Sequence, residues 1–254
     1  LPAGAAGAQA DPPMGHAAHG SVNPANDISS PPRTVGVILP VLNEADILET
    51  TLTEVLEQAP DEIVVVDGGS QDATCDIVRR RPALHLMEAQ RGRAAQMNAG
   101  AAAAHSDILL FLHADTRLPP QALASVRAAI HAGCVWGRFD VRLDSPRISY
   151  RVIEGFMNLR SALTGIATGD QAIFVRRDIF QQLGGFAPIS LMEDIELSAR
   201  LRRKQPPARI RTPVLASVRR WERRGIVRTV LLMWGLRLCY WLGVSPARLA
   251  RWYA

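Results

Sequence analysis

Two short apolar runs, each followed by a carboxylate, constrain the fold of this chain more than any other feature. Asp67 follows residues 62–66, and Asp115 comes shortly after residues 107–112. Neither run alternates between polar and apolar residues, which is typical of strands buried on both faces of a parallel sheet. Ligands of open α/β sheets bind at the carboxyl ends of the strands, so we expect Asp67 and Asp115 to share one rim. The alternative is that each aspartate is a turn or N-cap residue.

The order of the expected elements predicts an α/β fold with a mostly parallel central sheet flanked by helices. Strands and helices alternate in the first half of the chain, so the sheet begins parallel. Beyond Gly133 the pattern predicts an antiparallel addition, and Pro213 marks an edge or bulge. The expected strands cover residues 34–39, 62–66, 84–87, 107–112, 135–143, 171–175 and 209–218, and the later helices cover 94–104, 119–132, 148–163, 178–183 and 193–203.

Composition favours one folded catalytic domain with appendages. The 254 residues are 48% hydrophobic, which suffices for a sizeable core. Residues 1–33 are rich in Ala, Gly and Pro and lack an apolar core after a basic start, so they predict a disordered leader rather than a signal peptide. Cys75, Cys134 and Cys239 have no paired spacing, so they indicate neither a zinc site nor a disulfide framework and favour a reducing, cytoplasmic compartment.

Basic residues are concentrated at the C-terminal end of the chain. Residues 1–199 carry 15 basic and 23 acidic side chains, whereas residues 200–254 carry 14 basic and one acidic. Such a segment indicates a polyanionic partner: a membrane surface, nucleic acid or a phosphorylated substrate. Four of the five tryptophans lie in the same segment, and Trp beside Arg favours an anionic membrane surface, at the inner face of the cell membrane, over nucleic acid.

Residues 221–254 are therefore expected to form a helical appendage that is peripheral to the membrane. The stretch 226–244 is strongly apolar, but Arg228 and Arg237 interrupt it, and a membrane span needs about 20 uncharged residues. The two arginines fall on opposite faces of a helix, so their positions do not by themselves establish a simple amphipathic stripe. The alternatives are packing against the catalytic domain or against a second copy of the chain in a homodimer.

Six motifs follow one another along the chain: Leu39–Glu44, Asp67–Thr74, Arg91–Gly100, His113–Asp115, Gly169–Gln171 and Glu193–Asp194. Taken in this order, they resemble those of the family 2 glycosyltransferases. The similarity is greatest to a subgroup of small enzymes found beside radical-SAM and selenium-domain proteins. The resemblance implies a GT-A nucleotide-diphospho-sugar transferase fold over residues 34–220. It also implies inverting transfer of a sugar from a nucleotide-diphosphate sugar to a hydroxyl-bearing acceptor.

The resemblance assigns the donor site to the first four motifs. Asp67 matches an acceptor of hydrogen bonds from the base, although Gly68 stands where the family has a second aspartate. Arg91 and Arg93 suit phosphate because a guanidinium binds it bidentately, and a helix N-terminus follows them; the alternative is a solvated basic loop. The expected donor-binding residues are Pro40, Asn43, Glu44, Asp67, Gly69, Arg91, Arg93, Asn98, His113, Ala114 and Asp115.

His113-Ala114-Asp115 takes the place of the family's Asp-x-Asp metal motif. Asp115 is the matching residue, and its carboxylate suits Mg²⁺ or Mn²⁺ bridged to the diphosphate. His113 departs from the motif. It is open whether His113 ligates Mn²⁺, contacts phosphate or only packs.

Glu193 and Asp194 open a helix, and the resemblance makes Asp194 the general base that deprotonates the acceptor. Stabilisation by the helix dipole is the alternative explanation for both carboxylates. Adjacent helical residues point about 100° apart, so the two cannot form the facing pair of a glycosidase, and Glu193 is expected to support Asp194. The expected acceptor residues are Gly169, Asp170, Gln171 and Trp221.

Trp221 lies in a partial match to an element of processive sugar-polymer synthases, but Ser217 stands at its leading position, which favours single transfer. Two rival functions remain. A sugar nucleotidyltransferase needs a Gly-rich phosphate loop after the first strand, and residues 40–44 are not one. A non-catalytic sugar-nucleotide-binding membrane scaffold is suggested by His113 and Gly68, but Asp115 and Asp194 argue against it. The acceptor stays open between a lipid, a carotenoid-like molecule, a glycan and a small molecule.

Overall fold

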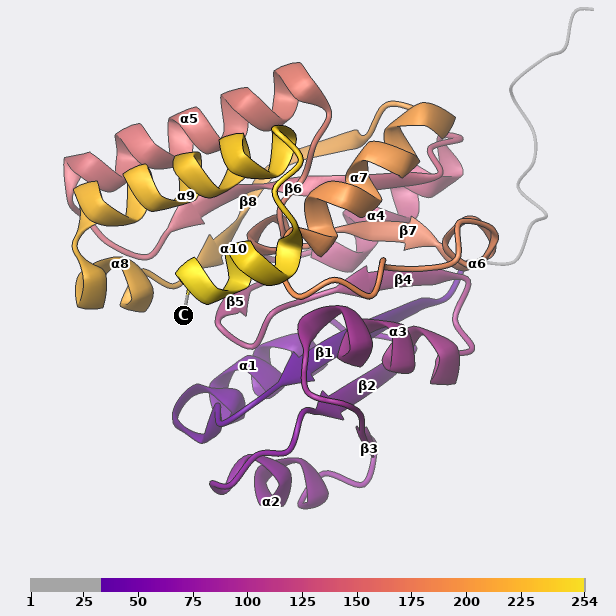
Figure 1. Cartoon of the computed structure of the whole chain (residues 1–254). Helices are drawn as coiled ribbons and strands as arrows, with labels where there is room; N and C mark the ends of the chain where they lie inside the picture. The colour runs from indigo at the N-terminus through magenta and orange to yellow at the C-terminus, as the bar shows by residue number, and fades with distance from the viewer. Residues whose placement is uncertain (1–32, 254) are drawn as a thin grey trace, which may run out of the picture. The chain divides into compact units, whose positions relative to one another are not determined.

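An eight-stranded sheet organises the part of the chain that the computed structural model describes, residues 33–253 without the side chains of Arg220, Arg223 and Arg224. The strand order is β3-β2-β1-β4-β7-β6-β8-β5 (Figure 1). The leader predicted over residues 1–33 lies, apart from its last residue, outside this description. The strands are β1 Val35–Val41, β2 Glu62–Asp67, β3 His85–Glu88, β4 Ile108–Phe111, β5 Thr116–Arg117, β6 Trp136–Leu143, β7 Phe174–Arg176 and β8 Ala208–Ala216.

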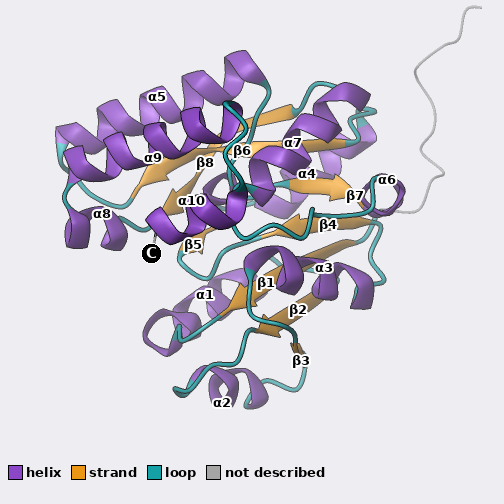
Figure 2. Ribbon diagram, in the orientation of Figure 1, coloured by secondary structure: helices purple, strands orange, loops and turns teal. Residues whose placement is uncertain are grey.

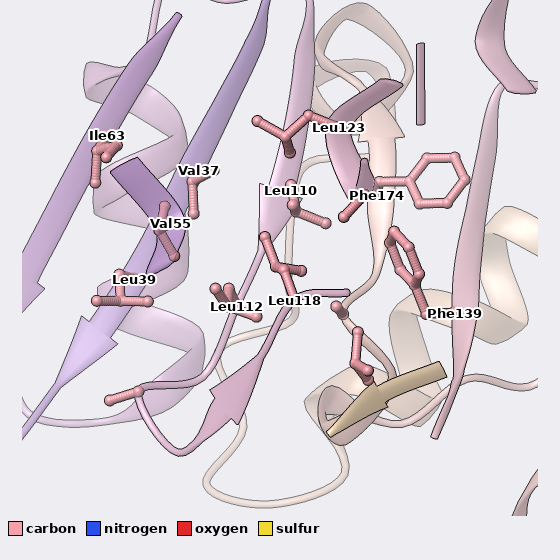
Figure 3. Packing of buried hydrophobic residues seen from close by; sticks show 14 of the residues in the cluster. Val37, Leu39, Val55, Ile63, Leu110, Leu112, Leu118, Leu123, Phe139 and Phe174 are labelled. Carbon is pink, nitrogen blue, oxygen red and sulfur yellow. The ribbon is translucent and has the colours of Figure 1, made fainter. Parts of the chain in front are cut away.

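The first half of the sheet is parallel and buried on both faces. β1 pairs with β2 and β4, and β2 pairs with β3, all in parallel. Along β1, Val37 and Leu39 enter one hydrophobic cluster while Ile38 enters another, and all three are fully buried. Figure 3 shows the first cluster, in which β1 residues lie near Leu110 of β4. The prediction of parallel strands covered on both sides is confirmed.

Helices cover both faces of the sheet (Figure 2). Side chains of α1, α2, α4 and α5 pack in the first cluster, and those of α3, α6 and α7 pack in the second. The predicted helix over 119–132 begins at Ala122 instead, because Gln121 is left-handed with φ 59°. The helices are α1 Ala45–Glu57, α2 Thr74–Arg79, α3 Arg93–Ala103, α4 Ala122–His131, α5 Ile148–Thr164, α6 Arg177–Gln182, α7 Glu193–Lys204, α8 Arg219–Arg224, α9 Ile226–Trp241 and α10 Pro246–Tyr253.

The second half of the sheet is mixed. β7 is antiparallel to β4 and to β6, but β6 and β8 run parallel, so the predicted antiparallel addition is antiparallel to one neighbour only. The register of β6 and β8 shifts between the pairs Phe139–Ile210 and Val141–Val214. Pro213 lies within this shift, which confirms the predicted bulge.

The strand predicted over 171–175 begins at Phe174, because a 3₁₀ turn occupies Gly169–Gln171. The N–H of Thr168 donates to Gln171 Oε1 at 3.2 Å, and Ala172 has φ 45°, which no strand residue adopts. Gln171 is thus a buried structural residue that closes a turn. This turn brings Gly169 and Asp170 to the rim of the sheet.

The C-terminal helices α9 and α10 pack against the start of α7. Leu236 of α9 and Leu249 of α10 form a buried cluster with Met192, the residue before α7. Packing on the domain, one of the alternatives left by the sequence, is therefore observed for one side of α9. Across residues 33–253 the structure contains no helix with both the length and the apolar character needed to cross a membrane.

Candidate active site

The loops that follow β1 and β2 are tied to each other. Asn43 has φ 53°, a left-handed conformation that Asn tolerates better than most residues. Its N–H donates to the Ser70 hydroxyl at 2.9 Å, and its Oδ1 accepts the N–H of Gln71 at 2.8 Å. These bonds fix the shape of the Pro40–Glu44 turn at the carboxyl end of the parallel strands.

Asp67 holds the loop that follows β2. Its side chain accepts the N–H groups of Gly69 and Ser70 at 2.9 Å each, and the Ser70 hydroxyl as well. The residue is only 2% exposed. Burial alone would raise the pKa of Asp67, but the hydrogen bonds from Ser70 and Gly69 outweigh it and lower the pKa. In this geometry Asp67 acts as a turn residue, which was the alternative left by the sequence. Contact between Asp67 and the base of a nucleotide stays a prediction.

Gln96 of α3 fills the space beside Gly68. Its Nε2 donates to the carbonyls of Val41 and Val66, at 2.8 and 2.9 Å, so it joins the ends of β1 and β2. A Cβ on Gly68 would lie 3.0 Å from Gln96 Cδ. The family's second aspartate would not fit here unless Gln96 moved. Gln96 was not among the predicted site residues, because its hydrogen-bond partners are main-chain groups of distant strands, which no residue type reveals.

A pocket of about 280 Å³ opens above the carboxyl ends of β1 and β4. It brings together residues from the loop after β1, the start of α3 and the His113–Asp115 segment. Gly92, with φ 140°, lets the chain turn into α3 between Arg91 and Arg93. The lining residues are Pro40, Val41, Leu42, Glu44, Arg91, Gly92, Arg93, Gln96, His113, Ala114 and Asp115.

Glu44 connects this pocket to α8. Arg219 Nη2 lies 3.1 Å from Glu44 Oε2, and both side chains are partly exposed. Burial raises the pKa of Glu44, Arg219 opposes the rise, and the charge of Asp115 adds to it. A partly exposed ion pair contributes at most about 1 kcal/mol to stability, so its main effect is to shape the pocket. Arg219 was not among the predicted site residues, because Glu44 and Arg219 lie far apart in the sequence.

His113 links the pocket to the Gly169–Gln171 turn. Its Nδ1 lies 3.7 Å from Asp170 Oδ1, and its side chain is almost entirely buried. The imidazole packs so closely on Gly169 that any Cβ at this position would collide with it. Packing, one of the three roles left open for His113, is therefore observed.

Asp194 is anchored at the N-terminus of α7. Its Oδ2 accepts the N–H of Gly169 at 2.8 Å, and its Oδ1 accepts the N–H of Ile195 at 2.7 Å. Met192 precedes the helix with φ 70°, an uncommon conformation for a residue other than Gly, and such residues cluster at functional sites. Asp194 thus lies beside Gly169, and together they line a small void with His113, which also lines the pocket.

Glu193 points into the protein. It is 6% exposed, and with Asp194 it lines a small void bounded by Phe111 and Phe186. Burial raises the pKa of Glu193, and the neighbouring charge of Asp194 raises it further. Glu193 is thus buried in the protein at the start of α7, whereas Asp194 contacts the Gly169 turn.

Comparison with known proteins identifies the family. The family model described as Glycosyl transferase family 2 matches residues 36–220. The chain belongs to this family. Glycosyltransferase AglE of Haloferax volcanii is 28% identical over 169 residues, which are 60% of this chain and 55% of that protein.

The solved structures of two other proteins share the fold of this chain. TarS 1–349 of S. aureus, solved in complex with UDP, has a TM-score of 0.60 at 17% identity over 73% of this chain and 60% of that one. Mannosyltransferase PcManGT of Pyrobaculum calidifontis, solved with GDP-Man and Mn²⁺, has a TM-score of 0.58 at 24% identity over 85% and 62%. The GT-A fold implied by the sequence is confirmed. This chain spans between half and two thirds of the length of all three proteins.

The oxygen ligands that line the pocket are of the type that divalent cations such as Mg²⁺ and Mn²⁺ prefer. Asp115 supplies one carboxylate at the rim, with Glu44 nearby. Mg²⁺ in such sites binds one or two carboxylates and takes its remaining ligands from water and phosphate. Across residues 33–253 no group of three or more His, Cys, Asp or Glu residues could hold a metal ion by itself. A cation bound here would therefore need further ligands from water or from a bound molecule.

Several predicted site residues lie away from the two centres. Asn98 exchanges two hydrogen bonds of 2.8 Å with the main chain of Phe186, and so positions the segment before α7 from behind the pocket. Gly69 belongs to the Asp67 loop, where φ is 92°. Trp221 is half-buried and lines a second cavity together with Asp170. Asn43 and Asp67 also do not line the pocket, because they hold the loops after β1 and β2. The other predicted residues lie in the pocket or at the Gly169 turn.

Proposed function

We propose that this chain transfers a sugar from a nucleotide-diphosphate sugar to a hydroxyl-bearing acceptor with inversion at the anomeric carbon. The observation that carries the proposal is that a pocket containing Asp115, Arg91 and Arg93 adjoins a turn held by Asp194, with His113 between them. The bound UDP of TarS and the bound GDP-Man of PcManGT support a nucleotide donor.

The donor pocket supplies charge for the diphosphate. Arg91 and Arg93 flank the start of α3, where guanidinium groups and the free N–H groups of a helix favour an anion. We assign Asp115 to hold Mg²⁺ or Mn²⁺ against the diphosphate. When bound, the ion offsets the charge that develops on the leaving nucleoside diphosphate. PcManGT, whose structure contains Mn²⁺, supports this choice of metal.

Asp194 is the proposed general base. Two of its lone pairs accept main-chain N–H groups, and a carboxylate offers about four, so it retains acceptor capacity. The acceptor oxygen attacks the anomeric carbon on the face opposite the diphosphate while Asp194 takes the hydroxyl proton. The bond between that carbon and the phosphate oxygen breaks, and its electron pair leaves with the nucleoside diphosphate. One displacement of this kind inverts the configuration.

The narrower assignments of the sequence remain proposals. These are membership of the subgroup found beside radical-SAM and selenium-domain proteins, a catalytic domain over 34–220 with an appendage over 221–254, and attachment at the cytoplasmic face of a membrane. From Arg33 onward the chain forms one compact unit, and the boundary at 220 falls inside α8. The appendage is thus proposed as a part of the catalytic unit that also contacts a membrane.

A thermal-shift panel of nucleotide sugars, with and without Mn²⁺, tests the proposed function. A ligand that binds the native state raises the melting temperature, by RT ln(1 + [L]/Kd) in free energy. We expect one nucleotide class to stabilise the wild type in a Mn²⁺-dependent way and to release nucleoside diphosphate when turned over. No shift across the panel would overturn the proposal. Release of pyrophosphate from a sugar phosphate and a nucleoside triphosphate would identify a nucleotidyltransferase, and nucleotide binding without any turnover would identify the scaffold.

A further inference from the structure

A second cavity lies beside the Gly169 turn, between α5 and α9. Its volume is about 510 Å³, larger than that of the donor pocket. Met157 of α5 and Met233 and Trp234 of α9 are among its mainly apolar walls, and Asp170 lines the end nearest the turn. Figures 1 and 2 show α5 and α9 running side by side. A cavity of this size accommodates a large part of a small organic ligand.

Two arginines project into this apolar cavity, Arg160 from α5 and Arg237 from α9. Nε and Nη2 of Arg160 and Nε of Arg237 are buried and have no hydrogen-bond partner in the described structure. Arg160 Nη1 makes only a long contact, 3.4 Å, to the carbonyl of Ile166. An unsatisfied buried donor on a charged group destabilises the fold, so such groups are normally paired.

Burial and the neighbouring carboxylates act in opposite directions on the pKa values of the two guanidinium groups. Burial lowers the pKa of Arg160 to about 10, with a further reduction from Arg237, while Asp194 opposes the shift. Burial also lowers the pKa of Arg237, and Asp194 and Asp170 oppose it. Both groups remain cations near pH 7. They lie close enough to interact with the proposed base, yet their buried N–H groups are left to be satisfied by another anion.

One exposed apolar stripe borders the cavity on α5. Ile148, Val152, Phe156, Leu159 and Leu163 recur at helical spacing and face outward, Leu163 with 78% of its surface exposed. Three of them, Phe156, Leu159 and Leu163, also line the cavity. The cavity is therefore continuous with the exposed stripe.

A matching stripe borders the cavity on α9. Val227, Leu231, Trp234, Leu238 and Trp241 are all exposed, Trp241 with 83% of its surface. Most of the large exposed apolar side chains of the described chain lie on these two helices. Apolar patches of this extent mark protein or membrane contacts, and Trp prefers the membrane interface.

We propose that the cavity between α5 and α9 is the acceptor site and that the acceptor is a membrane phospholipid whose headgroup carries a hydroxyl. The phosphate lies between Arg160 and Arg237, the hydroxyl faces Asp194, and the acyl chains pass over the apolar stripes into the bilayer. The inference rests on the proposed function, because it takes Asp194 as the base.

Charge complementarity selects a phospholipid over a second copy of the chain. In a closed two-fold dimer the same face meets itself, so this face would bring arginines toward arginines and supply no anion. A phosphate accepts several N–H bonds from paired guanidinium groups. Residues 200–254 carry 14 basic side chains and one acidic, which adds attraction to an anionic bilayer.

Calorimetric titration of the full chain with three probes tests the proposal. Dihexanoyl phosphatidylglycerol, used as a monomer, has the phosphate, the hydroxyls and the chains. Dihexanoylglycerol lacks the phosphate, and glycerol 3-phosphate lacks the chains. We expect only phosphatidylglycerol to bind well, and each of the other probes to bind at least about 10-fold more weakly, since each loses either charged hydrogen bonds or apolar burial.

Variants locate the site. Arg160→Gln and Arg237→Gln are expected to weaken phosphatidylglycerol binding by about 10- to 100-fold. Arg228→Gln, an exposed arginine on the same helix α9 that does not line the cavity, is the matched control and should change affinity less than twofold. Equal binding of dihexanoylglycerol by the wild type, or unchanged affinity in either cavity variant, would overturn the proposal. The comparison of probes needs no variant, so it decides the question even where a substitution prevents folding.

Nucleotide binding measured on the same wild-type sample separates the two proposals. Binding of nucleoside diphosphate and Mn²⁺ without phosphatidylglycerol binding overturns the acceptor site and leaves the proposed function standing. Phosphatidylglycerol binding without any nucleotide binding overturns the proposed function and leaves an anionic-lipid cavity.

Discussion

Replacing Asp194 by Asn tests the general base, and the structure predicts a second effect of the same change. Both carboxylate oxygens accept main-chain N–H groups, from Gly169 at 2.8 Å and from Ile195 at 2.7 Å. An amide has one oxygen and one NH₂ group, so one of these N–H groups must face another donor. The loss of one such bond costs about 1–3 kcal/mol. At roughly 2–4 °C per kcal/mol for a domain of this size, we expect a melting temperature about 2–12 °C lower.

Turnover should fall much further than stability. Removal of a general base lowers the rate by about 10²- to 10⁴-fold. The assay is release of nucleoside diphosphate with saturating donor and acceptor, at a temperature well below both melting transitions. Glu196→Gln is the matched control, because Glu196 is a carboxylate of the same helix that pairs with Arg200 away from the pocket. Wild-type turnover in Asp194→Asn would refute the assignment and direct attention to Glu193 or Asp170.

Four further predictions concern the metal, the turn, the loop and the membrane. Asp115→Ala should weaken binding of UDP, GDP or TDP with Mn²⁺ by about 10-fold or more in calorimetry, since it removes the rim carboxylate. Gly169→Ala introduces a Cβ that collides with His113, so it should lower kcat/KM. The same change should lower the free energy of unfolding by about 1–3 kcal/mol, measured as a lower melting temperature. The pKa of Asp67 is lowered from its ordinary value of 3.8, so the ionised carboxylate stabilises the fold above pH 3.8, and this stability is lost as the pH falls through the pKa of the folded state. In urea denaturation, Asp67→Asn should therefore be less stable than the wild type at pH 7, and the difference should shrink in acid. The full chain should sediment with anionic vesicles at low salt and less at high salt, whereas a variant truncated after residue 220 should not, and equal absence of the full chain from anionic and neutral pellets would contradict membrane contact.

The parallel half of the fold was predictable because each strand carries its own signal. A run such as residues 62–66 has no polar face, so it is buried wherever it pairs. The turn at Gly169–Gln171 was not predictable, since its apolar neighbours read as a strand. A long-range bond from the N–H of Gly169 to Asp194 holds it in another shape. The relative direction of β6 and β8 likewise depends on pairing between distant segments.

The candidate site was predictable as an ordered set of motifs, but its supporting contacts were not. Each motif lies at the end of a strand or the start of a helix, so the fold gathers them at one rim. Gln96 donates to two main-chain carbonyl groups, which every residue has, so no residue type in the sequence marks its partners. Arg219 pairs with Glu44 from α8, but an arginine can pair with any nearby carboxylate, so the sequence does not identify which one. The unpaired state of Arg160 also becomes visible only when its surroundings are known.

The packing of α9 and α10 on Met192 bears on how relatives of this chain should be compared. Sequence similarity to the family ends at residue 220, yet Leu236 and Leu249 lie beyond that point and bury the left-handed residue that introduces Glu193 and Asp194. The segment that matches the family model is thus shorter than the segment that packs around the start of α7, where the proposed base lies. Grafting the matched region alone onto another protein would therefore transfer the motifs without the helices that bury Met192.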